Sequence, residues 1–174
     1  MSAGVVLATE RLALRQLDGS DADAAFILAL VNEPSWLEFI GDRGVRTLEE
    51  ARAYIANGPR AMYRERGFGL WLVELGATAT PLGICGLIKR PTLDDVDLGF
   101  AFRPEFWGRG YAHEAAAATV THARDVVGLK RLVAITSPAN ARSIHLLEKL
   151  GLRFERVIPA NGAAPESRLF SATL

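Results

Sequence analysis

Residues Asp94–Gly128 decide the fold, and they read DDVDLGFAFRPEFWGRGYAHEAAAATVTHARDVVG. Apolar residues first alternate with acidic or small ones, the period of a β-strand, with Val96, Leu98, Phe100 and Phe102 on one face and Asp95, Asp97, Gly99 and Ala101 on the other. Pro104 ends this strand, and the alanine-rich run after Tyr111 predicts a helix. Gly108–Ala112 therefore lies where a strand passes into a helix N-terminus. There, unpaired N–H groups and the helix dipole favour an anion, and glycine allows close approach to a phosphate.

Two familiar nucleotide-binding motifs do not match this glycine segment. A P-loop needs GxxxxGK[ST], and no Lys-Ser or Lys-Thr pair follows at that spacing. The dinucleotide fingerprint GxGxxG begins correctly at Gly108 and Gly110, but His113 stands where the third glycine belongs. A GxG alone is weak evidence for a phosphate site, because a plain strand-to-helix turn also uses glycine.

Length and composition indicate one soluble globular domain. The 174 residues are near the usual size of a single domain, which we predict over residues 1–174. Hydrophobic residues make up 49% and charged residues 23%, an ordinary balance for a soluble protein. Twenty basic residues balance twenty acidic ones, so no overall field favours nucleic acid or a membrane surface. We therefore expect neither as a partner.

The cysteine count and the apolar runs indicate a cytoplasmic protein. Cys85 stands alone, which rules out an intrachain disulfide and fits a reducing compartment. The first ten residues have only a short apolar patch and no basic start, so they do not read as a signal peptide. No apolar run approaches the ~20 residues of a membrane span.

Hydrophobic patterns and turn residues divide the chain into short elements. The first predicted elements are a strand at Arg11–Leu17, a helix at Ser20–Val31, a short helix or loop at Asn32–Arg46, a helix opened by the capping box Thr47–Glu50, and a break at Gly58–Pro59 before Arg60–Arg66. Next come strands at Gly69–Leu75 and Leu82–Lys89, the stretch Asp94–Gly128, a strand at Arg131–Thr136, a helix at Asn140–Leu150, and an antiparallel pair at Arg153–Ile158 and Arg168–Leu174. This order indicates an α/β or α+β protein built on one sheet.

Two sequence blocks together resemble the GNAT acetyltransferase superfamily. Its pyrophosphate loop follows the pattern Gln/Arg-x-x-Gly-x-Gly/Ala, in which Glu105 takes the first position here. In the branch that acetylates the N termini of ribosomal proteins, this loop often reads aromatic-Trp-Gly-x-Gly-Tyr-Ala, and Phe106–Ala112 fits it closely. The second block, Asn140–Ser143 followed by Leu147–Leu152, is similar to the same branch's second cofactor motif. The resemblance covers Glu10–Leu174.

The resemblance implies a fold and a reaction. The fold is a mixed, mostly antiparallel central sheet flanked by helices on both faces, and coenzyme A sits between two splayed central strands, Asp97–Phe102 and Arg131–Thr136. The reaction is direct transfer of an acetyl group from acetyl-CoA to a primary amine, either a protein N-terminus or a small molecule. No metal is implied, and His122 and His145 are isolated, without the spacing of metal ligands.

The resemblance also assigns residues to the cofactor. Gly108–Ala112 would give backbone N–H groups to the pyrophosphate, and backbone groups of Phe100 and Phe102 would hydrogen-bond the pantetheine arm. Asn140 would reach the pantetheine amide, and it is also a good N-cap for the helix that follows. The implied cofactor-binding residues are Phe100, Phe102, Trp107, Gly108, Arg109, Gly110, Tyr111, Ala112, Asn140 and Ser143.

Two residues are candidates for proton transfer. Ser143 matches a serine that the branch places near the sulfur, which implies a proton donor; a serine on the helix surface is the alternative. Many family members use a later tyrosine, but no tyrosine follows the second block. Asp97 stands where relatives often carry a glutamate as general base, and the shorter acid would act through water. An acid on the solvent face of the strand is an equally open reading.

Other notable residues have simpler structural readings. His113 and Glu114 are more typical of solvated first-turn positions than of a catalytic pair, and Cys85 is more typical of a small buried hydrophobe. Trp36 and Phe39 belong mostly to the core, although they fall where the family's first helices line the acceptor pocket.

Two other functions stay open. An acyl-CoA-binding sensor or regulatory module with little turnover would suit the missing late tyrosine and the aspartate at position 97. A nucleotide-binding regulator would use the glycine loop for ATP or NAD. The pattern also leaves open whether the protein is a monomer or a homodimer.

Overall fold

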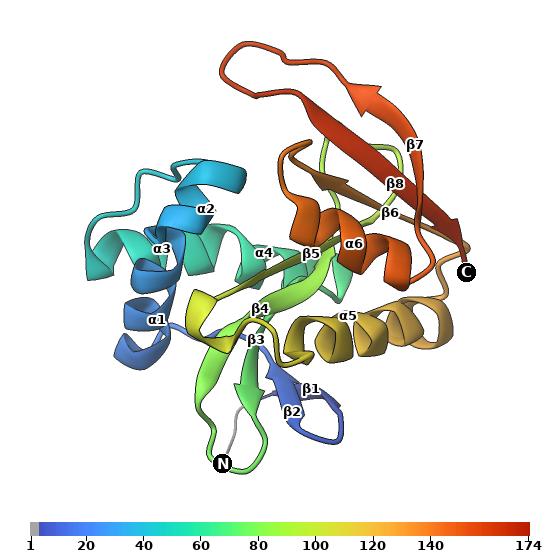
Figure 1. The fold of residues 1–174 in the computed structure, drawn as a ribbon. Coiled ribbons are helices and arrows are strands. Elements are labelled where there is room, and N and C mark those ends of the chain that lie inside the picture. The colour runs from blue at the N-terminus through green and yellow to red at the C-terminus, as the bar shows by residue number, and fades with distance from the viewer. Residues whose placement is uncertain (1–3) are drawn as a thin grey trace.

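The computed structural model describes residues 4–174, and an eight-stranded sheet runs through them (Figure 1). The strand order is β1-β2-β3-β4-β5-β6-β8-β7, and neighbours are antiparallel except β5 and β6, which are parallel. The mixed, mostly antiparallel sheet is therefore confirmed. The strands are β1 (Val5–Ala8), β2 (Leu12–Arg15), β3 (Leu70–Leu75), β4 (Pro81–Ile88), β5 (Asp97–Phe102), β6 (Arg131–Thr136), β7 (Arg153–Ile158) and β8 (Ser167–Thr173).

Helices cover both faces of the sheet, as the resemblance implies. On one face α1 packs against α3, and on the other α5 packs against β4 and β5 (Figure 1). A 3-10 turn at Pro104–Phe106 leads into the glycine loop, and a π-helical turn at Ala123–Val127 extends α5 to Gly128. The helices are α1 (Asp21–Val31), α2 (Pro34–Phe39), α3 (Leu48–Asn57), α4 (Pro59–Arg66), α5 (Tyr111–His122) and α6 (Ala141–Lys149).

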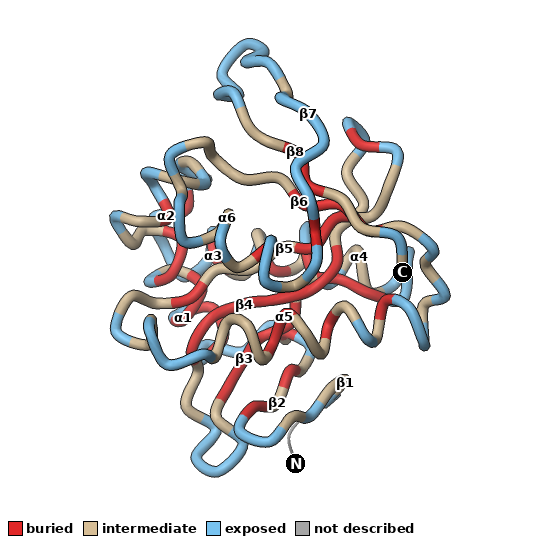
Figure 2. The backbone as a smooth tube through the Cα atoms, turned by 45° about the vertical axis from the view of Figure 1, so that its right-hand side comes forward, coloured by how far each residue is buried: buried red, intermediate tan, exposed pale blue. Residues whose placement is uncertain are grey.

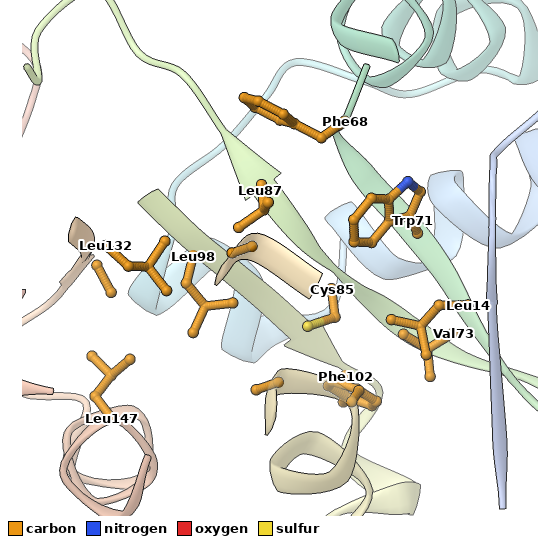
Figure 3. Close-up of a cluster of buried hydrophobic side chains, with 14 of the residues drawn as sticks. Leu14, Phe68, Trp71, Val73, Cys85, Leu87, Leu98, Phe102, Leu132 and Leu147 are labelled. Carbon is orange, nitrogen blue, oxygen red and sulfur yellow. The ribbon is translucent and has the colours of Figure 1, made fainter. Parts of the chain in front are cut away.

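Each face of the sheet has its own cluster of buried side chains. The cluster under α5 includes Cys85, Leu98 and Leu132 (Figure 3). The cluster under α1 and α3 includes Ile27 and Ile55. Figure 2 shows that buried residues concentrate in β3 and β4, whereas β7 and the loops are largely exposed. β4 is apolar along nearly its whole length because both of its faces are covered.

Cys85 is a buried structural residue. Its side chain is fully buried, and its Sγ lies 3.5 Å from Thr119 Oγ1. Burial raises the pKa of the thiol to about 12. The thiol is therefore neutral at physiological pH, whereas a nucleophilic cysteine must be a thiolate. The reading of Cys85 as a small buried hydrophobe is confirmed.

The two central strands separate from each other. β5 and β6 pair at Asp97 and Val133, where Val133 N–H donates to Val96 O at 3.1 Å. Within residues 4–174 this is the one registered pair between them, whereas β4 and β5 pair along six residues. Backbone groups on the β6 side of β5 are therefore left without a strand partner beyond Asp97. The predicted splay is confirmed.

Local signals fix several element boundaries as predicted. Ser20 Oγ accepts a hydrogen bond from Asp23 N–H at 3.2 Å, and the capping box of Thr47 and Glu50 is complete. Gly58 follows α3 directly and precedes α4, so the interruption at Gly58–Pro59 is also confirmed. Each of these caps satisfies backbone N–H groups that a helix start leaves unpaired.

The N-terminal strand is not predicted by the sequence pattern. Val5–Ala8 forms β1 and pairs antiparallel with β2, with a register shift between Val5 and Leu7. The prediction that the first strand of the chain begins at Arg11 is therefore wrong. Four residues are too few to show a clear alternation, and their pairing depends on the strand beside them. Among the helices of residues 4–174, none has the length and apolar character needed to span a membrane.

Candidate active site

The glycine loop forms an open turn at the start of α5. Gly108 and Gly110 have φ angles of 78° and 80°, in the left-handed region that residues with a Cβ resist. Gly110 is the N-cap of α5, and no side chain of the described chain caps the helix there. The first N–H groups of α5 are therefore free for a ligand at the positive end of the helix dipole, which favours an anion.

This turn forms one end of a cavity of about 560 Å³ between β5, α2 and the N-termini of α5 and α6. The volume is in the range of small-molecule and cofactor sites. Nine of the ten predicted cofactor-binding residues line it: Phe100, Phe102, Trp107, Gly108, Gly110, Tyr111, Ala112, Asn140 and Ser143. A long ligand that carries a phosphate would therefore place its anionic end at the N-terminus of α5.

Arg109 is the exception among the ten. It is exposed and does not line the cavity, and its carbonyl accepts a hydrogen bond from Arg11 Nη1 at 3.0 Å. Trp107 also makes two contacts within the protein. Its Nε1–H donates to Phe102 O at 3.0 Å, and the Arg142 guanidinium carbon lies 4.6 Å from the centre of its ring. The indole therefore links the end of β5 to α6 while it lines the cavity.

A second cavity of about 550 Å³ opens on the α3 and α4 side of the sheet. Apolar side chains from β3, β4 and β5 line it, together with Tyr54 of α3 and Met62 of α4. The two cavities share Trp36, Phe39, Ile40, Phe100, Ala101, Asn140 and Ser143. Two ligands that enter from opposite sides would therefore meet beside β5 and the start of α6.

Asn140 and Ser143 lie at this junction because α6 begins there. Asn140 is the N-cap, and its Oδ1 accepts a hydrogen bond from Ser143 N–H at 3.2 Å. The N-cap reading of Asn140 is therefore confirmed. The same bond fixes the first turn of α6, so Ser143 is placed at the point where both cavities meet.

Asp97 lines the second cavity and is buried, with 1% of the residue exposed. The solvent-facing alternative for this acid is therefore wrong. Its Oδ2 accepts from Arg90 Nε at 3.0 Å, whereas its Oδ1 is buried without a partner in residues 4–174. Burial raises the pKa of Asp97, and the positive charge of Arg90 offsets this only in part.

Glu114 is not a solvated first-turn residue, so that prediction is wrong. Its Oε1 accepts hydrogen bonds from Thr9 Oγ1 at 2.6 Å and from Arg11 N–H at 2.9 Å. Its Oε2 accepts from Arg11 Nε at 2.7 Å. Burial would raise the pKa of Glu114, but the hydrogen bonds from Thr9 and Arg11 outweigh it, and the pKa is lowered. The first turn of α5 is thereby joined to the turn between β1 and β2.

Trp36 and Phe39 lie on α2 and line both cavities. Trp36 is also a core residue, since 5% of it is exposed and it packs in the cluster under α1 and α3. The core reading of Trp36 is therefore confirmed, and a role in an acceptor pocket stays a prediction. Its indole Nε1 is buried and has no hydrogen-bond partner in the described chain.

The sequence pattern missed Tyr54, Arg43 and Arg90, which all line the second cavity. Burial raises the pKa of Tyr54, and the nearby positive charges of Arg43 and Arg90 lower it by less. These residues come from α3, from the loop before it and from the loop after β4, which only the sheet topology brings together. With Asp97 and Glu166, the cavity lining carries two positive and two negative side chains.

Comparisons with known proteins agree with this geometry. A family model described as an acetyltransferase (GNAT) domain matches residues 11–153. The uncharacterized N-acetyltransferase YoaA of Bacillus subtilis is 28% identical over 171 residues, which are 95% of this chain and 95% of YoaA. The crystal structure of an acetyltransferase from Agrobacterium tumefaciens is 28% identical, with a TM-score of 0.79 over 97% of this chain and 94% of that one.

A more distant structure has the same fold with a ligand in it. RimL, described as a ribosomal L7/L12 α-N-protein acetyltransferase and solved in complex with coenzyme A, is 17% identical to this chain. Its TM-score is 0.81, over 98% of both chains. Because the sequence identity is this low, the similarity to RimL is evidence for a shared fold alone.

The family match includes the glycine loop, both splayed strands and the whole of α6. The resemblance carried by Phe106–Ala112 and Asn140–Ser143 is therefore confirmed. The chain belongs to the acetyltransferase (GNAT) family.

Proposed function

We propose that this protein is an acetyl-CoA-dependent N-acetyltransferase that moves the acetyl group directly onto a primary amine. The observation that carries the proposal is the meeting of two cavities at Phe100 and Ser143, one of them with an anion-binding turn at its far end. A donor in the first cavity and an acceptor in the second would place thioester and amine beside β5. Such positioning is a large part of catalysis of a two-substrate reaction.

The first cavity, which begins at the glycine loop, offers suitable groups to both the pyrophosphate and the pantetheine arm of coenzyme A. The start of α5 offers unpaired N–H groups to a pyrophosphate, and the splayed edge of β5 offers backbone groups to the amides of the pantetheine arm. When bound, acetyl-CoA supplies an acetyl group activated as a thioester. We further propose that Arg109 adds positive charge near the pyrophosphate. The proposed reaction needs no metal.

Ser143 is the proposed proton donor to the leaving sulfur. It lines both cavities, and the hydrogen bond from its N–H to Asn140 holds it at the first turn of α6. The tyrosines of the described chain are Tyr54, Tyr63 and Tyr111, and none comes from the C-terminal elements. Tyr63 is engaged elsewhere, because its hydroxyl donates to Leu70 O and accepts from Leu17 N–H.

Asp97 is the proposed general base, acting through water. Its Oδ1 has no partner within the described part of the chain and can accept a hydrogen bond, while Arg90 holds Oδ2 in place. Three residues of strand, roughly 10 Å, separate Asp97 from Phe100, so an amine beside Phe100 would not touch the carboxylate directly. A raised pKa brings this carboxyl closer to the pH at which a base both stays ionised and accepts a proton well.

We expect Asp97→Asn to lower kcat/KM about tenfold to a hundredfold and to remove from its pH profile the rise that follows ionisation of Asp97. The base must be ionised, so wild-type kcat/KM should rise with pH through a pKa above the ordinary 3.8 of aspartate. The matched control is Asp94→Asn, because Asp94 is exposed and lines neither cavity. The substrate amine must lose its own proton and gives a separate rise at higher pH. Persistence of the lower-pH rise in Asp97→Asn would remove this residue from proton transfer.

The acceptor is a primary amine on a small molecule or on a protein N-terminus. The name of RimL gives that protein a ribosomal acceptor, and the same fold here makes a peptide N-terminus one candidate. The second cavity is mostly apolar with equal numbers of acidic and basic side chains, which favours neither a polycation nor a polyanion. We further propose a single cytoplasmic domain, monomeric or homodimeric, that needs no nucleic acid or membrane.

Calorimetric titration with acetyl-CoA, coenzyme A, ATP and NAD tests the proposed function. We expect selective binding of acetyl-CoA and coenzyme A, followed by turnover with at least one amine in a panel of peptide N termini, amino acids and polyamines. Binding of ATP or NAD without coenzyme A would instead indicate a nucleotide-binding regulator. Tight acetyl-CoA binding without transfer to any amine would favour the sensor function.

A further inference from the structure

The glycine loop has little packing of its own to hold its shape. Residues Gly108–Gly110 are exposed, and apart from its two chain neighbours no residue of the described chain has a heavy atom within 4 Å of the position a Cβ on Gly108 would take. Glycine loses more conformational freedom on ordering than any other residue. A loop with two glycines in the left-handed region therefore needs contacts from elsewhere to keep its N–H groups in one arrangement.

Arg11 makes these contacts from the N-terminal hairpin, which lies beside α5 (Figure 1). Its Nη1 donates to Arg109 O at 3.0 Å, and its guanidinium lies 4.5 Å from the ring centre of Tyr111. Its Nη2 lies 2.6 Å from Glu114 Oε2 and 3.4 Å from where a Cβ on Gly110 would stand. One side chain thus contacts residues on both sides of Gly110.

Glu114 fixes the direction of this guanidinium. Its carboxylate accepts hydrogen bonds from Arg11 Nε, from the backbone N–H of Arg11 and from the Thr9 hydroxyl. It also forms an ion pair with Arg11 Nη2. Thr9 is itself held in the β1–β2 turn, because its Oγ1 accepts from Leu12 N–H at 3.0 Å and its N–H donates to Leu12 O at 2.8 Å. The Arg11–Glu114 pair therefore connects the hydrogen-bonded β1–β2 turn to the loop.

We propose that Arg11, held by Glu114, is a positioning residue that keeps the backbone N–H groups of the glycine loop directed at the pyrophosphate of coenzyme A. This inference rests on the proposed function. Arg11 acts through the loop backbone, because its side-chain nitrogens are already engaged within the protein. Nε and Nη2 contact the Glu114 carboxylate, and Nη1 donates to the carbonyl of Arg109. Positive charge alone does not replace it, because only the planar guanidinium reaches a carboxylate and a carbonyl while it stacks on a ring.

The test compares Arg11→Met and Arg11→Lys with Arg124→Met. Arg124 also pairs with an acid, Asp125, but it lies beyond the far end of α5 and is half exposed. We expect both Arg11 variants to raise the calorimetric Kd for coenzyme A about tenfold, whereas Arg124→Met leaves it unchanged. Lysine keeps the charge and removes the fork, so Arg11→Lys separates positioning from simple attraction of an anion.

A second readout separates positioning from general damage to the fold. S-acetylpantetheine carries the thioester and the pantetheine arm but no pyrophosphate, so its kcat/KM should be the same in wild type and in both Arg11 variants. A coenzyme A Kd in Arg11→Lys equal to that of wild type would overturn the inference. An equal loss of kcat/KM with S-acetylpantetheine and with acetyl-CoA would overturn it as well. Failure of the wild-type protein to bind coenzyme A would instead overturn the proposed function.

Discussion

Gly110→Asp is expected to weaken coenzyme A binding at least a hundredfold, a loss of about 2.7 kcal/mol in binding free energy. Gly110 has a φ of 80°, which an aspartate adopts only with strain. The new carboxylate would stand at the N-cap of α5, where it would repel the pyrophosphate and compete for the same N–H groups. Calorimetric titration of coenzyme A into the purified variant measures the effect.

Gly128→Asp is the matched control for this experiment. Gly128 has a φ of 81°, and within residues 4–174 no residue beyond its two chain neighbours has a heavy atom within 4 Å of the position its Cβ would take. The substitution therefore brings the same charge and a similar backbone strain, but after the π-helical turn at the other end of α5. Its melting temperature should fall while its Kd for coenzyme A stays that of wild type. Unchanged affinity in Gly110→Asp would disprove our assignment of the loop.

Ser143→Ala is expected to lower kcat about a hundredfold while it changes the Kd for coenzyme A by less than about threefold. The hydroxyl acts on the leaving sulfur in our proposal, so its loss affects the reaction more than binding. Helix α6 should stay in place, because Asn140 accepts from the backbone N–H of residue 143, which the variant keeps. Steady-state kinetics and calorimetry on the same preparation separate the two effects.

Ser171→Ala controls for the chemical change alone. Ser171 lies on β8, lines neither cavity, and its hydroxyl is 3.4 Å from Glu155 Oε1. Its kcat should equal that of wild type. If Ser143→Ala also turned over at the wild-type rate, serine would have no part in the reaction.

The parts of the site predicted from sequence are those set by local chemistry. Gly108 and Gly110 had to adopt positive φ at a strand-to-helix turn, and Asn140 had to cap the helix after it. Caps and tight turns depend on a few neighbouring residues, so a single sequence shows them. The resemblance then added the roles of these positions toward coenzyme A, which neither periodicity nor spacing contains.

The parts that were missed depend on residues distant in the chain. Glu114 reads as a solvated first-turn acid because its partner, Arg11, lies 103 residues earlier. Likewise, the pattern leaves open whether Asp97 faces solvent, because the cavity that its side chain lines is formed in part by α3 and α4. The placement of β8 between β6 and β7 has the same origin, since strand order depends on tertiary packing rather than on the period of any one strand.

The single pair between β5 and β6 divides the sheet into two antiparallel halves that have almost no ladder between them. Buried side chains such as Leu98 and Leu132 hold the halves together from one face (Figure 3). A ligand that hydrogen-bonds the open edge of β5 would therefore act as a missing strand. Because a ligand that binds only the native state raises the free energy of unfolding, acetyl-CoA bound at this edge would stabilise the junction between the two halves of the sheet.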